Sequence, residues 1–487
     1  MGGVSCAVCG PRRAATRWSD TYVSFSVARQ YDDPMGLSSL RGAMAICVCL
    51  AMTASQGYAE DLLSAYHEAV AHDPVLAEAR ARLAEDRAGL PAARSALYPH
   101  IGAAASVGGN RAQVTGIGLP ILTDYLSDSY SVTLTQPLFN GQALSALGVA
   151  RARLRAGTAG LIQAQQHLIE AVTDAYFGVL EAQADARVAL RQKRLLTDIY
   201  RKTRAFLRVG SGDPIAVEEA RANLEAARAS AITASNAVRV ARARLARLTH
   251  RRFRRLRDLG PIRAQLPRPD AVAPWLAAAL ADQPRLEEAR ANLRAARAAV
   301  RYHERARWPT LAVVGVAQHG LGLLLPRVEV NQLGASLQLS LPIYQGGGVS
   351  AATAQAQAAA AVSRNRLRDV RDTIRLDTKT AFLNLQSSVS ELDAARAARR
   401  AARISWQATR KGYEVGTRSI IDLLTTATQY AAAERSYNLA LYNQILARVA
   451  LKGAAGVLRP TDILAINALL VRRSRPPAPS VAAAGSP

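Results

Sequence analysis

Three stretches of the chain alternate apolar and polar residues with a period of two, the pattern of a strand with one apolar face. The clearest is 333–341, where odd positions are Leu or Ala and even positions are Gly, Ser or Gln. The others are 101–110 and 129–138, and a fourth strand is predicted over 310–318. Strands of this length suit either an outer-membrane barrel, apolar toward lipid, or a half-buried soluble sheet. The alternation does not choose between these two.

Two much longer stretches, 141–208 and 349–414, contain no proline and are dominated by Ala, Leu, Gln, Arg and Glu. Each therefore predicts one continuous helix. At about 1.5 Å per residue, the first would be on the order of 100 Å long. A second helix is predicted after each, over 215–249 and 420–454. Each pair then forms a helical hairpin closed by a glycine-containing turn.

An Ala-rich helix is predicted before each pair of strands, over 61–96 and 273–307, and each is interrupted early by a proline. A proline also follows each helix and leads into the next strand. The segments that connect the paired strands, 111–128 and 319–332, are predicted to be loops.

The order of helix, two strands and helical hairpin occurs twice. Val-Gly-Ser at 209–211 corresponds to Val-Gly-Thr at 415–417, and Pro-Leu-Phe-Asn-Gly at 137–141 corresponds to Pro-Ile-Tyr-Gln-Gly at 342–346. The offset is nearly constant and far too long for a solenoid unit, so it indicates a tandem duplication. The predicted repeats are 60–259 and 260–471.

The start of the chain predicts an export signal. Arg41 precedes a short apolar run and a small-x-small cleavage site that ends at Ala59. The run is too short to span a bilayer. Residues 1–59 are therefore predicted to be a signal peptide, in which 1–34 are either an over-extended start or a long n-region. The proline-rich tail, 472–487, is predicted to be disordered.

Charge, cysteine and histidine content and the absence of catalytic motifs limit the functions that we expect. The formal net charge is +25, which could indicate an anionic partner. However, Arg recurs singly among Ala, as on the solvated face of a long helix, and no basic arm carries interleaved aromatics, so nucleic acid is not expected. All four cysteines precede residue 60 and the seven histidines are scattered, so no metal and no cofactor are expected. HExxH, GxSxG and P-loop motifs are absent, and an enzyme is not expected.

The strand number has a consequence for assembly. Four strands cannot close a transmembrane barrel, because the smallest need about eight. An open edge in lipid would leave backbone groups unpaired at several kcal/mol each. Two copies of the chain would supply eight strands and three would supply twelve, and only twelve leave a lumen wide enough for transport. We therefore expect a homotrimer.

The most specific segments, 412–422 (Gly-Tyr-Glu-Val-Gly-Thr-Arg-Ser-Ile-Ile-Asp) and 341–347 (Leu-Pro-Ile-Tyr-Gln-Gly-Gly), are similar to the TolC family of outer-membrane channel-tunnels. The resemblance covers about 61–470. It implies a mainly α fold with a transmembrane β-barrel, in which a trimer forms a twelve-stranded barrel in a Gram-negative outer membrane. It also implies a periplasmic tunnel of long coiled-coil helices that closes at its tip.

The resemblance further implies a periplasmic gate. In the family, a Tyr and an Arg of the second hairpin bond the neighbouring coiled coil, and a ring of Asp narrows the entrance. These residues map to Tyr413, Arg418 and Asp422. The family's second ring acid falls on Thr425, and the acid that faces the Arg is missing from its own position. Asp213, three residues away from that position, is the alternative partner for Arg418.

The expected function is an export duct without catalysis. By resemblance, it would work with an inner-membrane ABC transporter and with a periplasmic adaptor (membrane fusion protein) that grips the hairpin tips. The expected adaptor contacts are Val209, Gly210, Val415, Gly416 and Thr417. Two cargoes compete: an unfolded protein toxin of the adenylate cyclase-haemolysin (cyclolysin) type, passed by type I secretion, or small drugs passed by a tripartite efflux pump. A soluble periplasmic coiled-coil scaffold is the alternative from another class.

Overall fold

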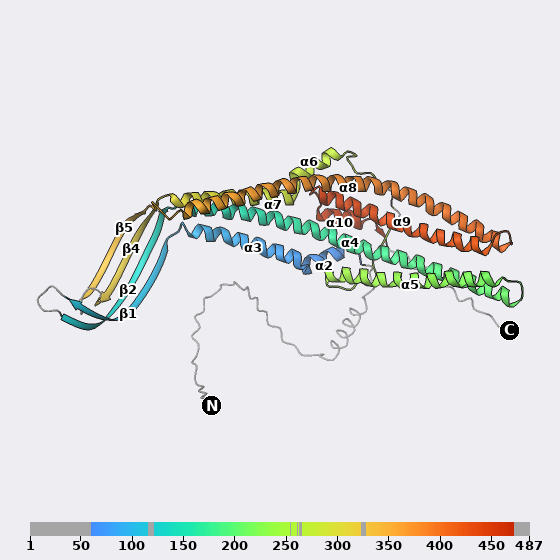
Figure 1. The fold of residues 1–487 in the computed structure, drawn as a ribbon, viewed down its shortest axis with the longest axis horizontal. Helices are drawn as coiled ribbons and strands as arrows, with labels where there is room; N and C mark the ends of the chain where they lie inside the picture. The colour runs from blue at the N-terminus through green and yellow to red at the C-terminus, as the bar shows by residue number, and fades with distance from the viewer. Residues whose placement is uncertain are drawn as a thin grey trace, which may run out of the picture. The chain divides into compact units, whose positions relative to one another are not determined.

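The computed structural model describes residues 60–114, 121–253, 255–260, 262, 265–322 and 328–471. The predicted signal peptide, 1–59, and the predicted tail, 472–487, lie outside the described residues. The described residues belong to one compact unit. Within it, a sheet stands at one end of the long helices and the turns of two helical hairpins stand at the other (Figure 1). None of the described helices carries an apolar stretch long enough to cross a bilayer.

The long helices follow the sequence closely. The first hairpin consists of α4 (Gly141–Arg208) and α5 (Pro214–Thr249), and the second of α8 (Gly348–Glu414) and α9 (Ile420–Ala454). The predicted bounds of α4 and α9 are confirmed, and α5 and α8 each begin one residue earlier than predicted. At the start of α4, Asn140 Oδ1 accepts a hydrogen bond from the N–H of Ala143 at 3.0 Å, which caps the helix. The two hairpins contact each other through α4 and α9.

The two entry helices are interrupted at the expected prolines. They are α2 (Leu62–His72) with α3 (Pro74–Ser95), and α6 (Val272–Asp282) with α7 (Pro284–Glu304), followed by the 3₁₀ turn η1 (Arg305–Arg307). At the first break, Asp73 Oδ1 accepts from the N–H of Leu76 at 2.7 Å. At the second, Gln283 Nε2 instead donates to the carbonyls of Gly453 and Ala454 at 3.0 and 2.9 Å. It thereby adds a donor to the last carbonyls of α9, which also accept from the N–H of Gly456 and the hydroxyl of Thr378.

Four antiparallel strands form the sheet, in the order β1 (His100–Val114), β2 (Ile121–Phe139), β4 (Thr310–Leu321) and β5 (Glu329–Ser340). The register places Ile101 opposite Leu134, Leu134 opposite Gly315, and Gly315 opposite Ala335. Because side chains alternate along a strand, the predicted apolar positions of β1, β2 and β5 share one face, which β4 continues with Leu311, Val313 and Ala317. The predicted alternation is therefore confirmed, and β1 and β5 are the edges of the sheet.

The predicted loops between strands are wrong in extent. Strand pairing continues into 111–114 and 121–128, and also into 319–321 and 329–332. The Arg111 Nε donates to Asp124 Oδ1 at 2.6 Å across the first pair. Charged and glycine-rich stretches read as loops in isolation, but a cross-strand partner keeps them extended here.

The main core lies where α4 meets α2, α5 and α9, around the fully buried Tyr176 and Phe177. The hydroxyl of Tyr176 lies 3.0 Å from the carbonyl oxygen of Arg257, to which it donates. Two elements here were not predicted: the short helix α10 (Pro460–Asn467) and a two-stranded sheet of β3 (Asp258–Leu259) with β6 (Leu470–Val471). This small sheet joins the segment after α5 to the segment after α9.

Candidate functional site

The turns at the ends of the two hairpins carry the residues that the sequence singles out. We name 206–216 the first tip and 412–422 the second tip. In the first tip, Gly210 has φ +76°, and its N–H donates to the carbonyl of Leu207 at 3.1 Å. The N–H of Ser211 donates to the carbonyl of Phe206 at 3.1 Å. These two bonds and the left-handed glycine define a Schellman motif, which ends α4.

The second tip repeats this turn. Gly416 has φ +78°, and its N–H donates to the carbonyl of Tyr413 at 3.1 Å. The N–H of Thr417 donates to the carbonyl of Gly412 at 2.8 Å. The duplication seen in the sequence therefore extends to the hydrogen bonds of the two turns.

Each turn displays an apolar side chain to solvent. Val209 is 76% exposed and Val415 is 74% exposed. Each precedes its left-handed glycine, so the two valines occupy the same position in the two tips. Single exposed apolar side chains are common on protein surfaces, so their matching position in the two tips is the feature that stands out.

Asp422 begins α9 in a capping box. Its backbone N–H donates to Ser419 Oγ at 3.1 Å, and its Oδ2 accepts from the N–H of Ser419 at 3.2 Å. These hydrogen bonds, helped by the positive charge of Arg418, hold the pKa of Asp422 below its ordinary value. The carboxylate therefore stays ionised down to more acidic pH than that of an unpaired Asp.

Tyr413 is half-buried and packs on an apolar cluster that joins the two hairpins. We name this set the tip cluster; it comprises Leu196, Ile199, Ala220, Leu224, Ala227, Leu423 and Leu424. Its members come from α4, α5 and α9. Burial raises the pKa of the Tyr413 phenol. Tyr413 is thus held by hydrophobic contact within the second tip, which also carries Asp422 and Arg418.

Asp213 stands on the other tip, where it caps α5. Its Oδ1 accepts from the N–H of Ile215 at 2.9 Å. Among the described residues, no ion pair joins Asp213 to Arg418, whose side chain is exposed. The pairing of these two residues stays a prediction.

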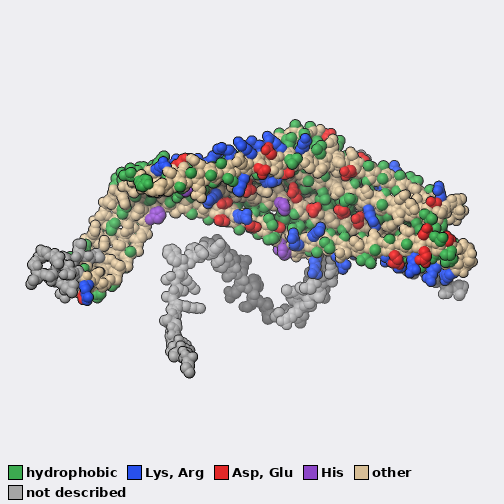
Figure 2. Space-filling view, viewed as in Figure 1, with side chains coloured by type: hydrophobic (Ala, Val, Ile, Leu, Met, Phe, Trp, Pro, Cys, Tyr) green, Lys and Arg blue, Asp and Glu red, His purple; other side chains and the backbone are tan. Residues whose placement is uncertain are grey.

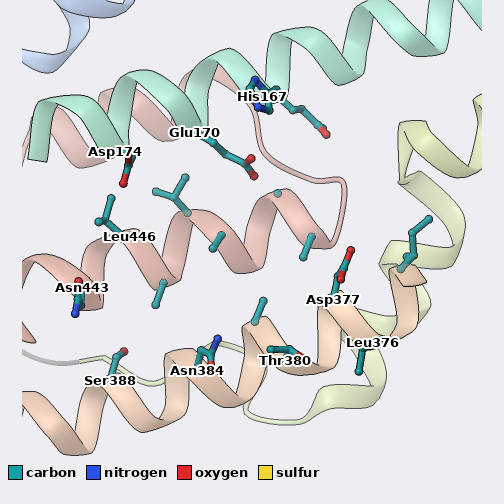
Figure 3. A pocket seen from close by; sticks show the side chains of 18 of the residues that line it. His167, Glu170, Asp174, Leu376, Asp377, Thr380, Asn384, Ser388, Asn443 and Leu446 are labelled. Carbon is teal, nitrogen blue, oxygen red and sulfur yellow. The ribbon is translucent and has the colours of Figure 1, made fainter. Parts of the chain in front are cut away.

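A groove of about 1090 Å³ lies between α4, α8 and α9 and was not foreseen. Acidic and amide side chains line it, including Glu170, Asp174, Asp377 and Asn443 (Figure 3). Burial raises the pKa of Glu170, opposed by the nearby His167. No sequence signal marks this site, because an acid on a long helix looks the same whether it is buried or exposed. The described residues hold no cluster of His, Cys, Asp and Glu that fits a metal ion.

Comparison with known proteins agrees with this architecture. The sequence profile of the outer membrane efflux protein family matches residues 65–250 and 275–457. Outer membrane protein TolC of Escherichia coli K12 is 27% identical over 425 residues, covering 85% of each chain. Alkaline protease secretion protein AprF of Pseudomonas aeruginosa is 29% identical over 445 residues, covering 88% of this chain and 91% of that one.

A solved structure shares the fold. The CmeC outer membrane channel of Campylobacter jejuni superposes with a TM-score of 0.73 at 18% identity, covering 85% of this chain and 90% of that one. The relatives are outer-membrane channel and secretion proteins, which agrees with the expectation that the chain is not an enzyme. The chain belongs to the outer membrane efflux protein family, and it is an outer-membrane channel protein with a helical part of the TolC type.

Proposed function

We propose that the chain is an export duct that works as a homotrimer, with a twelve-stranded barrel in the outer membrane and a helical tunnel in the periplasm. The observation that carries this is the four-stranded sheet with two open edges and one apolar face. Ile101, Leu333 and Leu337 on that face are 74%, 89% and 64% exposed. Such a face suits lipid, and edges in lipid need partners from further copies.

The charge distribution supports the same placement. Lys and Arg are spread along the helices among Asp and Glu, whereas the strands carry few charges (Figure 2). Aromatic residues gather where the strands meet the helices. Phe139 and Trp308 stack there at 6.2 Å, and Tyr98 and Tyr344 are exposed nearby in the chain. Aromatic girdles of this kind mark the interface between lipid and water.

The second tip would form the periplasmic gate. Three copies of Asp422, one from each subunit, would create a negative ring near the threefold axis that attracts cations. Tyr413 and Arg418 would bond the neighbouring subunit, with Asp213 as the acid that Arg418 meets. A charge-assisted hydrogen bond contributes about 1.5–3 kcal/mol. That is strong enough to hold a closed tip and weak enough for a docking partner to break.

The partners would dock at the same end. A periplasmic adaptor would grip the two tips through Val209 and Val415 and through the backbone of Gly210, Gly416 and Thr417. An inner-membrane ABC transporter would deliver the cargo to the tunnel. The nearly equal exposure of the two valines supports one adaptor surface that binds both tips.

For the cargo, we favour an unfolded protein toxin of the adenylate cyclase-haemolysin type, passed by type I secretion. The alignment with AprF, named for alkaline protease secretion, supports protein export, since it spans 88% of this chain. The name of the family supports the alternative, small-molecule drug efflux.

Deletion of the gene in its own host tests this function. Protein export predicts that the toxin disappears from the culture supernatant, that haemolysis is lost, and that drug susceptibility is unchanged. Complementation with the wild-type gene should restore secretion. A deletion strain that secretes normally but becomes sensitive to drugs and dyes would establish the efflux alternative.

A further inference from the structure

We propose that Gly412 is a positioning residue. Because it has no side chain, the Cβ and Cγ of Arg418 can pack on the backbone of α8, a contact that we name the seat of Arg418. The seat would hold this arginine in a conformation that can close the second tip. The proposal rests on the gate proposed above. It assigns a role to a glycine that the turn itself does not require.

The contact is close. A Cβ on Gly412 would lie 2.7 Å from Arg418 Cγ and 3.4 Å from Arg418 Cβ. It would also lie 3.2 Å from Thr417 Oγ1, the hydroxyl that donates to the Gly412 carbonyl at 3.1 Å. The stem of Arg418 therefore rests on the backbone of α8 at the one position in the last turn that lacks a side chain. Any other residue at 412 would push the arginine away.

The first tip shows that the turn does not need this glycine. With an offset of 206 residues, Gly412 corresponds to Phe206 and Arg418 corresponds to Gly212. Both tips nevertheless form the same Schellman motif. Gly412 lies inside α8 with ordinary helical geometry, and the left-handed conformation belongs to Gly416.

The same contact is reversed in the first tip. A Cβ on Gly212 would lie 2.5 Å from the backbone nitrogen of Leu207 and 2.8 Å from the backbone carbon of Phe206. No side chain fits at 212, because the atoms it would meet belong to the backbone of α4. Each tip thus has one glycine at this contact. It follows the turn in the first tip (Gly212) and precedes the turn in the second tip (Gly412). Only the arrangement in the second tip leaves room for an arginine.

The seat lowers the entropic cost of the bond between Arg418 and the neighbouring subunit when the tip closes. Arg418 is exposed and forms no ion pair with another described residue, yet its charge is near enough to lower the pKa of Asp422. An exposed arginine samples many rotamers, and ordering it opposes bond formation. Packing its Cβ and Cγ on Gly412 restricts that freedom before the neighbouring subunit is met, which strengthens the bond by pre-organisation.

The test is Gly412→Ala in the full trimer, reconstituted in planar bilayers. Alanine favours helix, so α8 should be preserved while Arg418 loses its seat. We expect the ratio of open to closed channels to rise about tenfold, toward the value of Arg418→Ala. If Gly412 acts through Arg418, the double variant Gly412→Ala/Arg418→Ala should be no more open than Arg418→Ala alone.

The matched control is Gly89→Ala, the same substitution in a helix where an added Cβ meets nothing within 4 Å. It should leave the channel unchanged. The seat is refuted if Gly412→Ala behaves as wild type while Arg418→Ala opens the channel, or if the two effects add. If Arg418→Ala itself fails to open the channel, the gate and the seat fall together.

Discussion

Glu170 is a half-buried carboxylate in the groove between α4, α8 and α9. It extends from α4 toward α9, and its carboxylate lies so close to Gly453 that a side chain at 453 would displace it. Burial raises its pKa above the ordinary 4.5, because the charged form loses hydration. The folded protein therefore keeps the proton more tightly than the unfolded chain. Below pH 4.5 both states are protonated, and stability falls as the pH rises from there through the folded pKa.

Replacing Glu170 with an uncharged residue should remove this loss of folding stability at neutral pH. We expect Glu170→Gln to unfold at a higher temperature than wild type at neutral pH, with the two melting temperatures converging as the pH falls toward 4.5. The control is Glu391→Gln, the same change at an exposed acid of the same groove. Thermal scans from acidic to neutral pH measure both. Parallel curves for wild type and Glu170→Gln would contradict the burial argument.

Ser419 supports both a helix and a charge. Ser419→Ala should destabilise the start of α9 by about 1 kcal/mol, the usual effect of losing an N-cap. It also removes one of the hydrogen bonds that lower the pKa of Asp422. The channel should then lose cation selectivity at a higher pH than wild type, since the ring is protonated sooner.

Reversal potentials in a salt gradient, titrated toward acidic pH, measure this change. Ser419→Thr keeps a hydroxyl that can cap the helix, and it should retain the wild-type midpoint. An unchanged midpoint in Ser419→Ala would show that the capping box does not set the charge of the ring.

Among the helices, the tip cluster is the contact that joins the two hairpins at their ends. Leu424 is 4% exposed within it, so Leu424→Ala should cost about 2–5 kcal/mol through lost contacts and a cavity. Because the cluster lies at the tips, we expect faster amide exchange at the end of α4 and the start of α9. The strands should keep their wild-type rates.

Leu439→Ala provides the comparison. Leu439 lies on the same helix and is 45% exposed, so its truncation should cost well under half as much. Hydrogen exchange monitored by mass spectrometry resolves the two ends of the hairpins. Equal exchange in both variants would mean that the tip cluster does not hold the hairpins together.

The four helices of the two hairpins were predictable because their signals are local. Proline at the start of α5, an asparagine cap before α4 and left-handed glycines after α4 and α8 define the ends from neighbouring residues alone. Strand ends depend on partners elsewhere in the chain. Arg111 remains extended because Asp124 lies across from it. The strands β3 and β6 have two residues each, which leaves no periodicity to detect.

The candidate site was predictable only in part. The glycines of both turns predict where the hairpin tips lie, and the resemblance to the TolC family identifies Tyr413, Arg418 and Asp422 as candidate gate residues. The capping box of Ser419 with Asp422 also follows a local spacing. The contact between Gly412 and Arg418 does not, because it depends on how the chain returns over the helix after the turn.

For the molecule as a whole, the most decisive prediction concerns which face of the sheet contacts lipid. Leu337 and Gln338 are neighbours on β5, and a single step along a strand changes the face. If the apolar face meets lipid, Leu337→Lys should cost about 2–4 kcal/mol near the bilayer centre. Gln338→Lys places the same charge on the opposite face, toward a wet lumen, and should be tolerated.

Outer-membrane fractionation and the yield of folded trimers on native gels measure both variants. We expect Leu337→Lys to reduce trimers in the membrane fraction and Gln338→Lys to match wild type. The pair separates a membrane barrel from a soluble scaffold, because a soluble sheet has no lipid-facing side. In a scaffold, a lysine at exposed Leu337 would be harmless. Equal yields of the two variants, with neither reduced, would therefore count against the barrel and against the duct built on it.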